Sequence, residues 1–341
     1  MAHTRGLLLS NLGTPASPEP KDVRAFLKEF LSDPRVLDMG PIGKWILLNC
    51  IILPFRPKKS AEAYRLVWTD EGSPIMIHSR NLAKGLSQKL GDEWVVGLGM
   101  RYGTPSMKQA LDGLIEARVD EVLFLPLYPQ YALSSTATSI EHFESLAKST
   151  ENMPPYRIVQ DFFEDPAFCD PSTALAKRHI PDSVDHVLFS FHGLPVHQVK
   201  ATDPTGAHCS QSENCCDQIC EANRLCYRAQ SHQTARRLAE SLELADEDWT
   251  IAFQSRLTKV PWIKPYTDEA LIELAEKGVK HLAVMCPSFV ADCLETLEEI
   301  DIRARESFLE AGGEDFTFVP CLNDNEEWIA GLEDLVKRSV Q

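Results

Sequence analysis

The sequence contains no apolar run long enough to cross a membrane and no glycine-rich segment of the kind that holds a nucleotide phosphate. Its longest apolar stretch, residues 42–55, is interrupted by a lysine and an asparagine and is shorter than the ~20 residues that a spanning helix needs. Gly97 and Gly99 fall within an expected strand, and Gly103 comes one residue too late for the dinucleotide-binding pattern. A Gly-x-Ser-x-Gly motif is absent as well. We therefore expect neither a nucleotide cofactor nor a serine hydrolase.

Basic residues are scarce relative to acidic ones: 34 Lys and Arg stand against 50 Asp and Glu, which gives a formal net charge of −16. Such a surface repels a phosphate backbone, so we expect no nucleic-acid partner. The apolar run near the start of the chain is interrupted by Asn11 and ends before Pro15, so it is too short for the apolar region of an export signal. With 341 residues, 44% of them hydrophobic, the chain is predicted to be a folded cytoplasmic protein, large enough for two domains.

Cysteine, by contrast, is abundant, with ten residues. Without an export signal, this number favours metal binding or reactive thiols over disulfides. Five of the cysteines lie in residues 209–226, with the spacing C-x5-C-C-x3-C-x5-C. Thiolates at this density repel one another unless a metal neutralises them, and four thiolate ligands suit either zinc or a [2Fe-2S] cluster. The spacing alone leaves open which four of the five would bind.

Short apolar runs bounded by turn residues alternate with segments of helical periodicity, which is typical of parallel sheets covered by helices. The expected strands are residues 6–12, 95–101, 121–128, 186–192, 250–256, 281–287 and 316–321. The expected helices include residues 21–31, 82–90, 107–117, 227–244, 269–277 and 292–311. This order predicts a doubly wound α/β fold.

Two parts of the sequence can be laid over each other, which suggests that the chain is built twice. The segments that start at Gly97 and Ile251 both read strand, arginine, proline-bearing loop, helix, strand and proline, and Arg101 then aligns with Arg256. A chance match of two ordinary βα units is the alternative. In open α/β sheets ligands bind at the carboxyl ends of the strands, so residues that follow strands are the candidates for function.

His192 ends an expected strand, and Asp292, Glu295 and Glu299 follow another one with the spacing i, i+3 and i+7. A single histidine is more often structural, and an acidic stripe on a helix is more often a solvated surface. A neutral imidazole together with a carboxylate nevertheless suits a divalent transition metal, and either group can accept a proton. Position and spacing therefore predict a generic site for a metal and a proton.

Residues 42–55 are expected to form a half-buried helix. The apolar side chains of this stretch, which include Trp45 and Ile51, are followed by Arg56, Lys58 and Lys59. This combination also suits a surface that dips into a membrane interface.

At these residues the sequence resembles the ferrochelatases, over nearly the whole chain. The segments that carry the resemblance are SNLGTP at Ser10, GSPI at Gly72, RYGTP at Arg101, LPLYPQYALSSTATS at Leu125, SFHGLP at Ser190, FQSR at Phe253, PWIKPYTDE at Pro261 and PSFVADCLETLEEI at Pro287. The resemblance implies two Rossmann-like domains of the chelatase type, each a parallel sheet flanked by helices. We expect these domains at residues 1–165 and 166–322, with a C-terminal helix at residues 323–341 packing back on the first.

The resemblance also implies a lyase that inserts ferrous iron into protoporphyrin IX, the last step of heme biosynthesis. It assigns His192 and Glu295 to the iron at the centre of the porphyrin, and Asp292 and Glu299 to a path for iron or protons. Of the central pair, His192 is our choice for the group that accepts the pyrrole protons. The porphyrin pocket is implied at Leu12, Ser73, Arg101, Tyr102, Tyr128, Ser134 and Trp262. The sequence departs from the family at Cys293, where many members have a histidine.

The cysteine-rich insert resembles that of a minority of bacterial ferrochelatases with a [2Fe-2S] cluster, and we favour this cluster over zinc. The resemblance selects Cys209, Cys215, Cys216 and Cys226 as ligands, with Cys220 as the alternate. Competing interpretations are a chelatase for coproporphyrin or another tetrapyrrole, and an iron-sulfur sensor built on an inactive chelatase fold. In the light of the resemblance, residues 42–55 are expected to form an apolar lip for the porphyrin, with peripheral contact at the inner face of the membrane.

Overall fold

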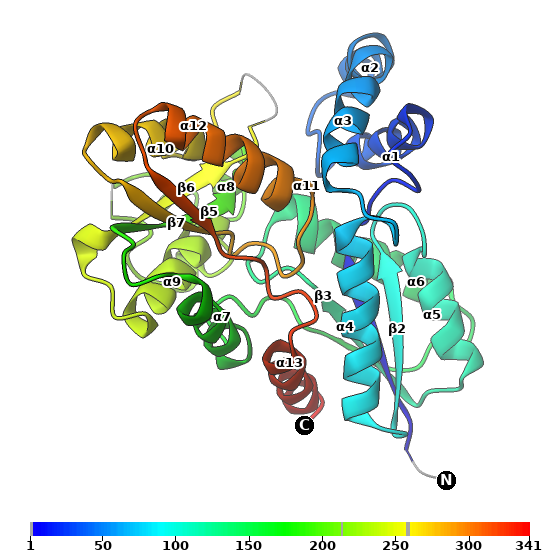
Figure 1. Cartoon of the computed structure of the whole chain (residues 1–341). Helices are drawn as coiled ribbons and strands as arrows, with labels where there is room; N and C mark the ends of the chain where they lie inside the picture. The colour runs from blue at the N-terminus through cyan, green and yellow to red at the C-terminus, as the bar shows by residue number, and fades with distance from the viewer. Residues whose placement is uncertain (1–2, 213, 257–259) are drawn as a thin grey trace. The chain divides into compact units, whose positions relative to one another are not determined.

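The computed structural model describes residues 3–212, 214–256 and 260–341. They form two compact units, which are considered one at a time. The first comprises Met1–Leu127, Leu133–Gln160 and Asp324–Gln341, and the second comprises Tyr128–Ala132 and Asp161–Asn323. Each unit contains a four-stranded parallel sheet with helices packed against it (Figure 1). The predicted α/β fold with a parallel sheet in each half is therefore confirmed.

The sheet of the first unit has the strand order β2-β1-β3-β4. Its strands are β1 (Arg5–Asn11), β2 (Trp94–Met100), β3 (Glu121–Pro126) and β4 (Tyr156–Ile158). Three consecutive leucines of β1, Leu7 to Leu9, are fully buried. A strand that is buried on both faces needs apolar residues at every position rather than at alternate ones, and this explains the continuous apolar run in the sequence.

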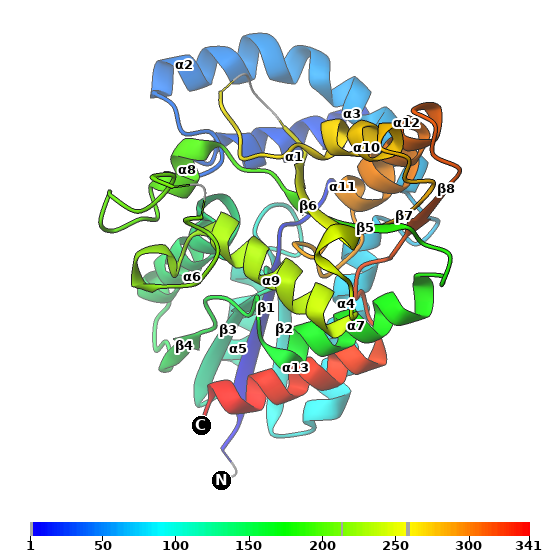
Figure 2. The same ribbon diagram turned by 90° about the vertical axis from the view of Figure 1, so that its left-hand side faces the viewer.

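Helices cover this sheet, and a small helical group extends from it. They are α1 (Pro20–Ser32), α2 (Pro41–Ile46), the π-helix η1 (Leu47–Ile52), α3 (Leu53–Val67), α4 (Pro74–Leu90), α5 (Met107–Glu116), the π-helix η2 (Leu133–Ala137), α6 (Thr138–Ser149) and α13 (Glu326–Ser339). The C-terminal helix α13 packs against α4, as expected (Figure 2). Its apolar face includes Trp328 and Leu332, which are fully buried.

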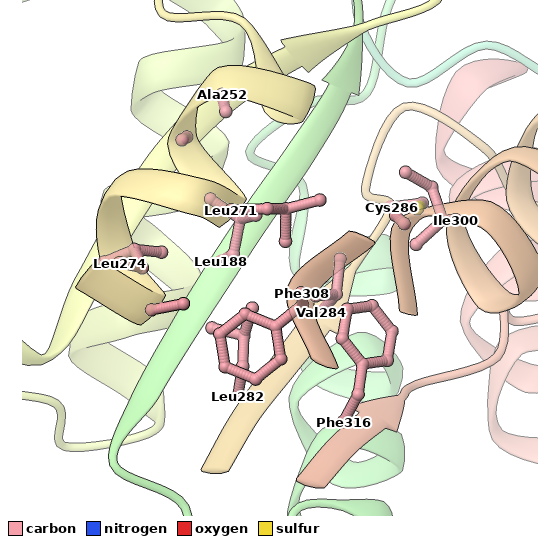
Figure 3. Close-up of a cluster of buried hydrophobic side chains, with 13 residues drawn as sticks. Leu188, Ala252, Leu271, Leu274, Leu282, Val284, Cys286, Ile300, Phe308 and Phe316 are labelled. Atoms are coloured by element: carbon pink, nitrogen blue, oxygen red, sulfur yellow. The ribbon is translucent and has the colours of Figure 1, made fainter. Parts of the chain in front are cut away.

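The sheet of the second unit has the order β6-β5-β7-β8. Its strands are β5 (His186–His192), β6 (Trp249–Gln254), β7 (His281–Met285) and β8 (Asp315–Phe318). The helical segments are α7 (Pro166–His179), α8 (Val196–Lys200), η3 (Glu221–Asn223), α9 (Tyr227–Ser241), η4 (Asp246–Asp248), α10 (Thr267–Glu276), α11 (Leu294–Thr296), the π-helix η5 (Leu297–Ala304) and α12 (Arg305–Glu310). Helices α10 and α12 lie on one face, where Leu188, Leu282 and Phe308 share a buried cluster (Figure 3).

The two sheets share one strand order, and one local motif occurs in both. In the first unit the backbone N–H of Met100 donates to the carbonyl of Pro105 at 2.7 Å; in the second, Phe253 donates in the same way to Pro265 at 2.8 Å. Helices α5 and α10 follow these contacts directly. Arg101 comes immediately after Met100, whereas Arg256 is the third residue after Phe253. The alignment of these two arginines was therefore wrong, because the intervening loops differ in length.

The expected helix over residues 292–311 begins later and is not uniform. Cys293 is the N-cap residue, so Asp292 lies outside the helix, and the π-helix η5 separates α11 from α12. The spacing i, i+3, i+7 consequently does not describe one continuous α-helical face. Elements that were not predicted include β4, which has three residues, and helices α6, α7 and α8.

Residues 42–55 lie in α2, η1 and the start of α3, and thus in a helical segment as expected. None of the helices in the described part of the chain has the length and apolar character needed to span a bilayer.

Candidate active site

His192 occupies the carboxyl end of β5, where its ring has a defined hydrogen bond. The ring atom Nδ1 lies 2.7 Å from the carbonyl oxygen of Gly193. Because a carbonyl only accepts, Nδ1 carries the hydrogen and a neutral ring keeps the lone pair on Nε2. The backbone N–H of His192 donates to Ser288 Oγ at 3.0 Å. The imidazole is half-buried, and in its neutral form it can bind a metal or a proton through Nε2.

Gly193 allows the chain to turn tightly after this histidine. Its N–H donates to the carbonyl of Gln254 at 2.7 Å. A Cβ at this position would lie 2.7 Å from the same oxygen, so a larger residue would displace the neighbouring strand β6. The sequence His-Gly thus fixes the imidazole at the edge of the sheet.

Gln254, at the end of β6, connects the elements of this site through a buried amide that is only 3% exposed. Its Nε2 donates to the backbone carbonyl of Glu295 at 2.7 Å, and its Oε1 accepts a hydrogen bond from Ser190 Oγ at 2.7 Å. The thiol of Cys286, which follows β7, also donates to Oε1 at 3.7 Å. One side chain therefore joins β5, β6, the end of β7 and α11.

Glu295 lies in α11 and Glu299 one turn later in η5. Both carboxylate oxygens of Glu299 are held by one residue: Ser255 N–H donates to Oε1 at 3.0 Å and Ser255 Oγ donates to Oε2 at 2.6 Å. Burial raises the pKa of Glu299, and the negative charge of Glu295 raises it further. The hydrogen bond from Ser255 and the charges of His192 and Arg303 lower the pKa, but the net shift is upward. His192, Glu295 and Glu299 are thus electrostatic neighbours within the second unit.

Asp292 is in a different environment. Its side chain is buried and accepts hydrogen bonds from Asn323 Nδ2 at 2.7 Å, Thr296 Oγ1 at 3.1 Å and the backbone N–H of Cys321 at 3.2 Å. Its own N–H donates to Asn323 Oδ1 at 2.8 Å. These bonds tie the loop before α11 to the segment after β8.

The segment after His192 pairs with the segment that contains Trp262. Val196 N–H donates to the carbonyl of Pro261 at 2.9 Å, and Ile263 N–H donates to the carbonyl of Leu194 at 3.0 Å. We call this pairing the His192 ladder. Trp262 is 8% exposed, and the edge of its ring lies 3.4 Å from where a Cβ of Gly193 would be. Trp262 therefore packs directly against the loop that carries the histidine.

Arg101 in the first unit belongs to a buried network around Asp33. Asp33 Oδ2 accepts hydrogen bonds from Arg101 Nη2 at 2.5 Å, Tyr102 Oη at 2.8 Å and Thr138 Oγ1 at 2.6 Å. Burial acts to raise the pKa of Asp33, but these bonds, the backbone N–H of Arg35 and the charge of Arg101 outweigh it, so the pKa is lowered. The Arg101 guanidinium thus has an internal partner in Asp33.

The remaining residues of the expected porphyrin pocket lie in both units. In the first unit, Ser73 is buried and accepts a hydrogen bond from Thr14 Oγ1 at 2.9 Å, and Tyr102 is 1% exposed. Leu12 follows β1 and Ser134 lies in η2; both are half-buried. Tyr128 and Trp262 belong to the second unit.

The four cysteines selected by the resemblance gather around one pocket. Cys209, Cys215, Cys216 and Cys226 line a cavity of about 390 Å³ together with Trp262 and other residues of the His192 ladder. Cys215 Sγ and Cys216 Sγ are 3.7 Å apart. The Cys216 thiol donates to the Cys226 sulfur, which raises the pKa of Cys216 and lowers that of Cys226. Of the arginines nearby, Arg228 Nη1 lies 3.2 Å from Cys216 Sγ.

Cys220 points elsewhere. It is exposed, and its Sγ lies 4.0 Å from His208 Nε2. Within residues 3–212, 214–256 and 260–341, no group of three or more His, Cys, Asp or Glu side chains has an arrangement that could hold a metal ion.

Several residues of this site were not identified from the sequence: Gln254, Ser255, Asp33 and Arg228. Gln254 and Ser255 lie in the quoted segment FQSR, near the end of the predicted strand 250–256, and that position was the available signal. Asp33 has no such signal, because the side chains that donate to its carboxylate are 68 or more residues away in the sequence.

Comparison with solved structures defines the class of fold. SirB from Bacillus subtilis with Fe³⁺ matches with a TM-score of 0.54 at 9% sequence identity, covering 98% of this chain and 95% of that one. The sirohydrochlorin chelatase SirB from Bacillus subtilis subspecies spizizenii in complex with cobalt matches with a TM-score of 0.50 at 8% identity, covering 98% and 95%. At such identities the likeness establishes the fold alone, which is that of the chelatases.

Sequence comparison defines the family. The ferrochelatase family model matches residues 4–340. The ferrochelatase of Legionella pneumophila (strain Paris) is 46% identical over 340 residues, with coverage of 98% of this chain and 99% of the relative. That of Coxiella burnetii (strain Dugway 5J108-111) is 43% identical over 337 residues, covering 98% and 94%. The chain belongs to the ferrochelatase family.

The Asp33 network predicts a pH-dependent stability. Because the folded-state pKa of Asp33 is lowered, its contribution is complete above the ordinary aspartate pKa of ~3.9 and is lost as the pH falls through the folded value. Asp33→Asn leaves Arg101 without its buried counter-charge, so we expect a loss of about 3 kcal/mol at pH 7. Thermal unfolding from pH 7 to pH 3 should show the variant and the parent protein converging below pH 4.

The control is Glu141→Gln, which removes the carboxylate that pairs with Arg35 at the surface, where Glu141 is 50% exposed. A change of at most about 0.5 kcal/mol is expected there. A stability difference for Asp33→Asn that stays constant from pH 7 to pH 3 would contradict the assignment.

Proposed function

We propose that this protein is a lyase that inserts Fe²⁺ into protoporphyrin IX to form protoheme. One observation carries the proposal: a half-buried histidine at the end of β5, with a free lone pair on Nε2 when neutral, is an electrostatic neighbour of Glu295 and Glu299 in a chain of the ferrochelatase family. These groups supply a base and two carboxylates, which suit a divalent iron and the protons that it displaces.

Proton removal is assigned to His192. Two pyrrole N–H protons must leave for each Fe²⁺ that enters. A neutral imidazole is well matched to accept them one after the other near pH 7, releasing the first to solvent before it takes the second. Nε2 receives the proton while Nδ1–H remains bonded to the carbonyl of Gly193, which stabilises the resulting imidazolium. The bond also fixes the ring plane, so that acceptance needs no reorientation of the side chain.

Iron delivery is assigned to the acidic side chains, with Glu295 beside His192 as the group next to the metal. Carboxylate oxygens and an imidazole nitrogen are both suitable ligands for Fe²⁺. Of the two acids implied to lie on the path, Glu299 is near Glu295, whereas the carboxylate of Asp292 already accepts three hydrogen bonds from protein groups.

Contact with the macrocycle is assigned to the pocket positions of the family. Leu12, Ser73, Arg101, Tyr102 and Ser134 belong to the first unit, and Tyr128 and Trp262 to the second. Porphyrin insertion requires the planar ring to bend so that its nitrogen lone pairs leave the plane, and rigid apolar walls supply that strain from binding energy at the periphery. Trp262 is suited to form such a wall, because it is buried and packs directly against Gly193. The hydrogen bond to buried Asp33 holds the Arg101 side chain in its pocket position.

The catalytic pair gives a direct test. His192→Ala should lower kcat for Fe²⁺ insertion into protoporphyrin by about 10² to 10⁴, the usual range for loss of a general base. Glu295→Gln should also abolish most activity. His281→Ala, which changes a histidine at the start of β7, serves as the control. Normal insertion by His192→Ala together with loss in Glu295→Gln would make Glu295 the proton acceptor.

The same assay discriminates between substrates. Rates with coproporphyrin measured beside those with protoporphyrin identify the preferred macrocycle. A chain that inserts iron into neither would support the sensor interpretation instead.

We infer that the cysteine insert binds a [2Fe-2S] cluster through Cys209, Cys215, Cys216 and Cys226, which line one cavity. Because these side chains do not form a metal site in the described residues, binding requires them to turn toward a common centre. Two thiolates on one tetrahedral metal with bonds of ~2.3 Å lie ~3.8 Å apart, close to the 3.7 Å between Cys215 and Cys216. Burial raises the pKa of Cys209 and Cys215, so these groups stay thiols until a metal replaces the proton. Arg228, next to Cys216, offsets the negative charge of a four-thiolate centre. When bound, such a centre cross-links four thiolates and can carry one electron.

Visible absorption distinguishes the proposed set of four cysteine ligands from a set in which Cys220 replaces Cys216. Cys216→Ser should remove the absorption and the iron and sulfide content of the purified protein. Cys220→Ser should retain all three, because Cys220 is turned toward His208. A colourless parent protein that contains zinc would overturn the cluster assignment.

We infer further that the protein is cytoplasmic and that the helical segment α2–η1–α3 contacts the inner face of the membrane. Its apolar side chains are unusually exposed: Ile42 is 76% exposed, Phe55 74%, Trp45 62% and Ile51 55%. Basic residues, Lys44, Arg56, Lys58 and Lys59, accompany them. Apolar groups beside lysine and arginine favour an interface with anionic lipids, although the chain as a whole carries a net charge of −16.

Trp45→Glu should reduce co-sedimentation with vesicles of 30% anionic and 70% neutral lipid by about tenfold, because it places a charge on the apolar surface. Ile272→Glu, at a position 43% exposed on α10, is the matched control and should bind as the parent does. Equal binding of Trp45→Glu and the parent would exclude this segment as the contact.

A further inference from the structure

We propose that Gln230 is a positioning residue for porphyrin binding, which links the cysteine insert, residues 209–226, to the loop Tyr128–Ala132. The inference rests on the proposed function and deepens it. Tyr128 is one of the residues assigned to the macrocycle, whereas Gln230 lies on α9 and outside that set. The link gives a route by which the state of the insert reaches the porphyrin.

The loop Tyr128–Ala132 depends on other segments for its conformation. It belongs to the second unit, although the chain directly before and after it belongs to the first. All five of its residues are described, and none of them lies in a helix or a strand. Its backbone polar groups must therefore find partners outside regular secondary structure.

The side-chain amide of Gln230 bonds to this loop on one side and to the insert on the other. Its Oε1 accepts the N–H of Tyr131 at 2.6 Å, and its Nε2 donates to the carbonyl of Arg224 at 2.8 Å. These partners fix the orientation of the amide, because a backbone N–H only donates and a carbonyl only accepts. Gln230 is 0% exposed, so loss of either bond would leave a buried polar group unpaired.

Thr234, one helical turn after Gln230, makes a second contact with the same loop. Its Oγ1 accepts a hydrogen bond from Gln130 Nε2 at 3.0 Å and donates to the carbonyl of Phe163 at 2.8 Å. Gln130 Nε2 also donates to the carbonyl of Pro287 at 3.3 Å. Residues at i and i+4 share one face of a helix, so Gln230 and Thr234 together hold the loop against α9.

The other end of the link is fixed within the insert. Arg224 lies two positions before Cys226, and its guanidinium donates two hydrogen bonds to Asp161, at 2.9 and 3.0 Å. A bidentate pair of this kind is strongly directional. The N–H of Gln230 also donates to the carbonyl of Cys226 at 3.0 Å. A rearrangement of the insert at Cys226 therefore changes the groups that Gln230 binds.

This arrangement predicts an effect on one substrate and not on the other. A contact loop that is already ordered costs less free energy to order when its ligand binds, so the residues that hold it contribute to affinity. The groups assigned to iron, His192 and Glu295, lie in other segments of the second unit. Loss of the Gln230 bonds should therefore weaken the binding of protoporphyrin and leave that of Fe²⁺ unchanged.

The first test measures iron insertion by the full-length protein. Gln230→Leu retains a side chain of similar size and helix propensity but removes both hydrogen bonds. We expect the KM for protoporphyrin to rise by about tenfold, as when a buried N–H loses its acceptor, while the KM for Fe²⁺ stays within twofold. Gln233→Leu is the matched control on the same helix. Its amide accepts from Arg236 instead, so both constants should match those of the parent.

Thr234→Val is a second variant of nearly unchanged shape, which loses only the hydroxyl group that binds Gln130. It should also raise the KM for protoporphyrin selectively, and it decides the question if Gln230→Leu is too unstable to purify. Hydrogen–deuterium exchange reports on the loop directly. The peptide with residues 128–132 should exchange faster in both variants and at the parent rate in Gln233→Leu, because amides that lose their anchors open more often.

Cys216→Ser, which should remove the proposed cluster, tests the link to the insert. Exchange in residues 128–132 should become faster in this variant. Combining it with Gln230→Leu should produce no further increase, because both changes act through the same bonds. An unchanged exchange rate in Cys216→Ser, or increases that add fully in the double variant, would overturn the link.

A KM for protoporphyrin within twofold of the parent in Gln230→Leu, or an equal rise for both substrates, would overturn the assignment of Gln230. These outcomes leave the proposed function intact if the parent protein inserts iron. Absence of iron insertion by the parent would refute the proposed function. The exchange measurements need no turnover, so they would still decide whether Gln230 joins the insert to the loop.

Discussion

A single buried amide joins the elements at the carboxyl end of the second sheet. The side-chain amide of Gln254 bonds to Ser190 in β5, to Cys286 after β7 and to the carbonyl of Glu295 in α11. The backbone carbonyl of the same residue accepts the N–H of Gly193. Because an unpaired buried amide is costly, each of these partners must keep its position for the others to be satisfied. The spatial relation between His192 and Glu295 is therefore set by β6, which contributes neither of them.

The amino-acid pattern was sufficient to predict the two parallel sheets, but it did not determine the environment of individual polar groups. Continuous apolar strands such as β1 and β5 are visible in a sequence because burial on both faces demands them. His192 and Glu299 were candidates because His192 ends such a strand and Glu299 follows another one. Strand β4 has only three residues, two of them exposed, and thus carries no comparable pattern.

Asp292 and Glu299 illustrate what the pattern could not supply. Both are acidic residues a few positions apart, and in a regular helix they would share a face. The environment that distinguishes them comes from Asn323 and Cys321, about thirty positions along the chain, and from the backbone dihedral of Ser255. Neither long-range hydrogen bonding nor a positive φ at serine leaves a local signature, so resemblance could assign the two acids to one path but not separate them.

The cavity lined by the cysteines shares a wall with the His192 ladder, since Val196, Pro261, Trp262 and Ile263 border it. A cysteine substitution that changes the volume of this cavity would therefore displace the backbone of the His192 ladder and, with it, His192. This effect on the histidine requires no electron transfer. Loss of enzyme turnover in a cysteine variant is consequently not evidence of redox chemistry in this protein. Only variants that alter the occupancy of the proposed iron-sulfur centre while leaving the packing of Trp262 unchanged can separate an electronic from a mechanical influence.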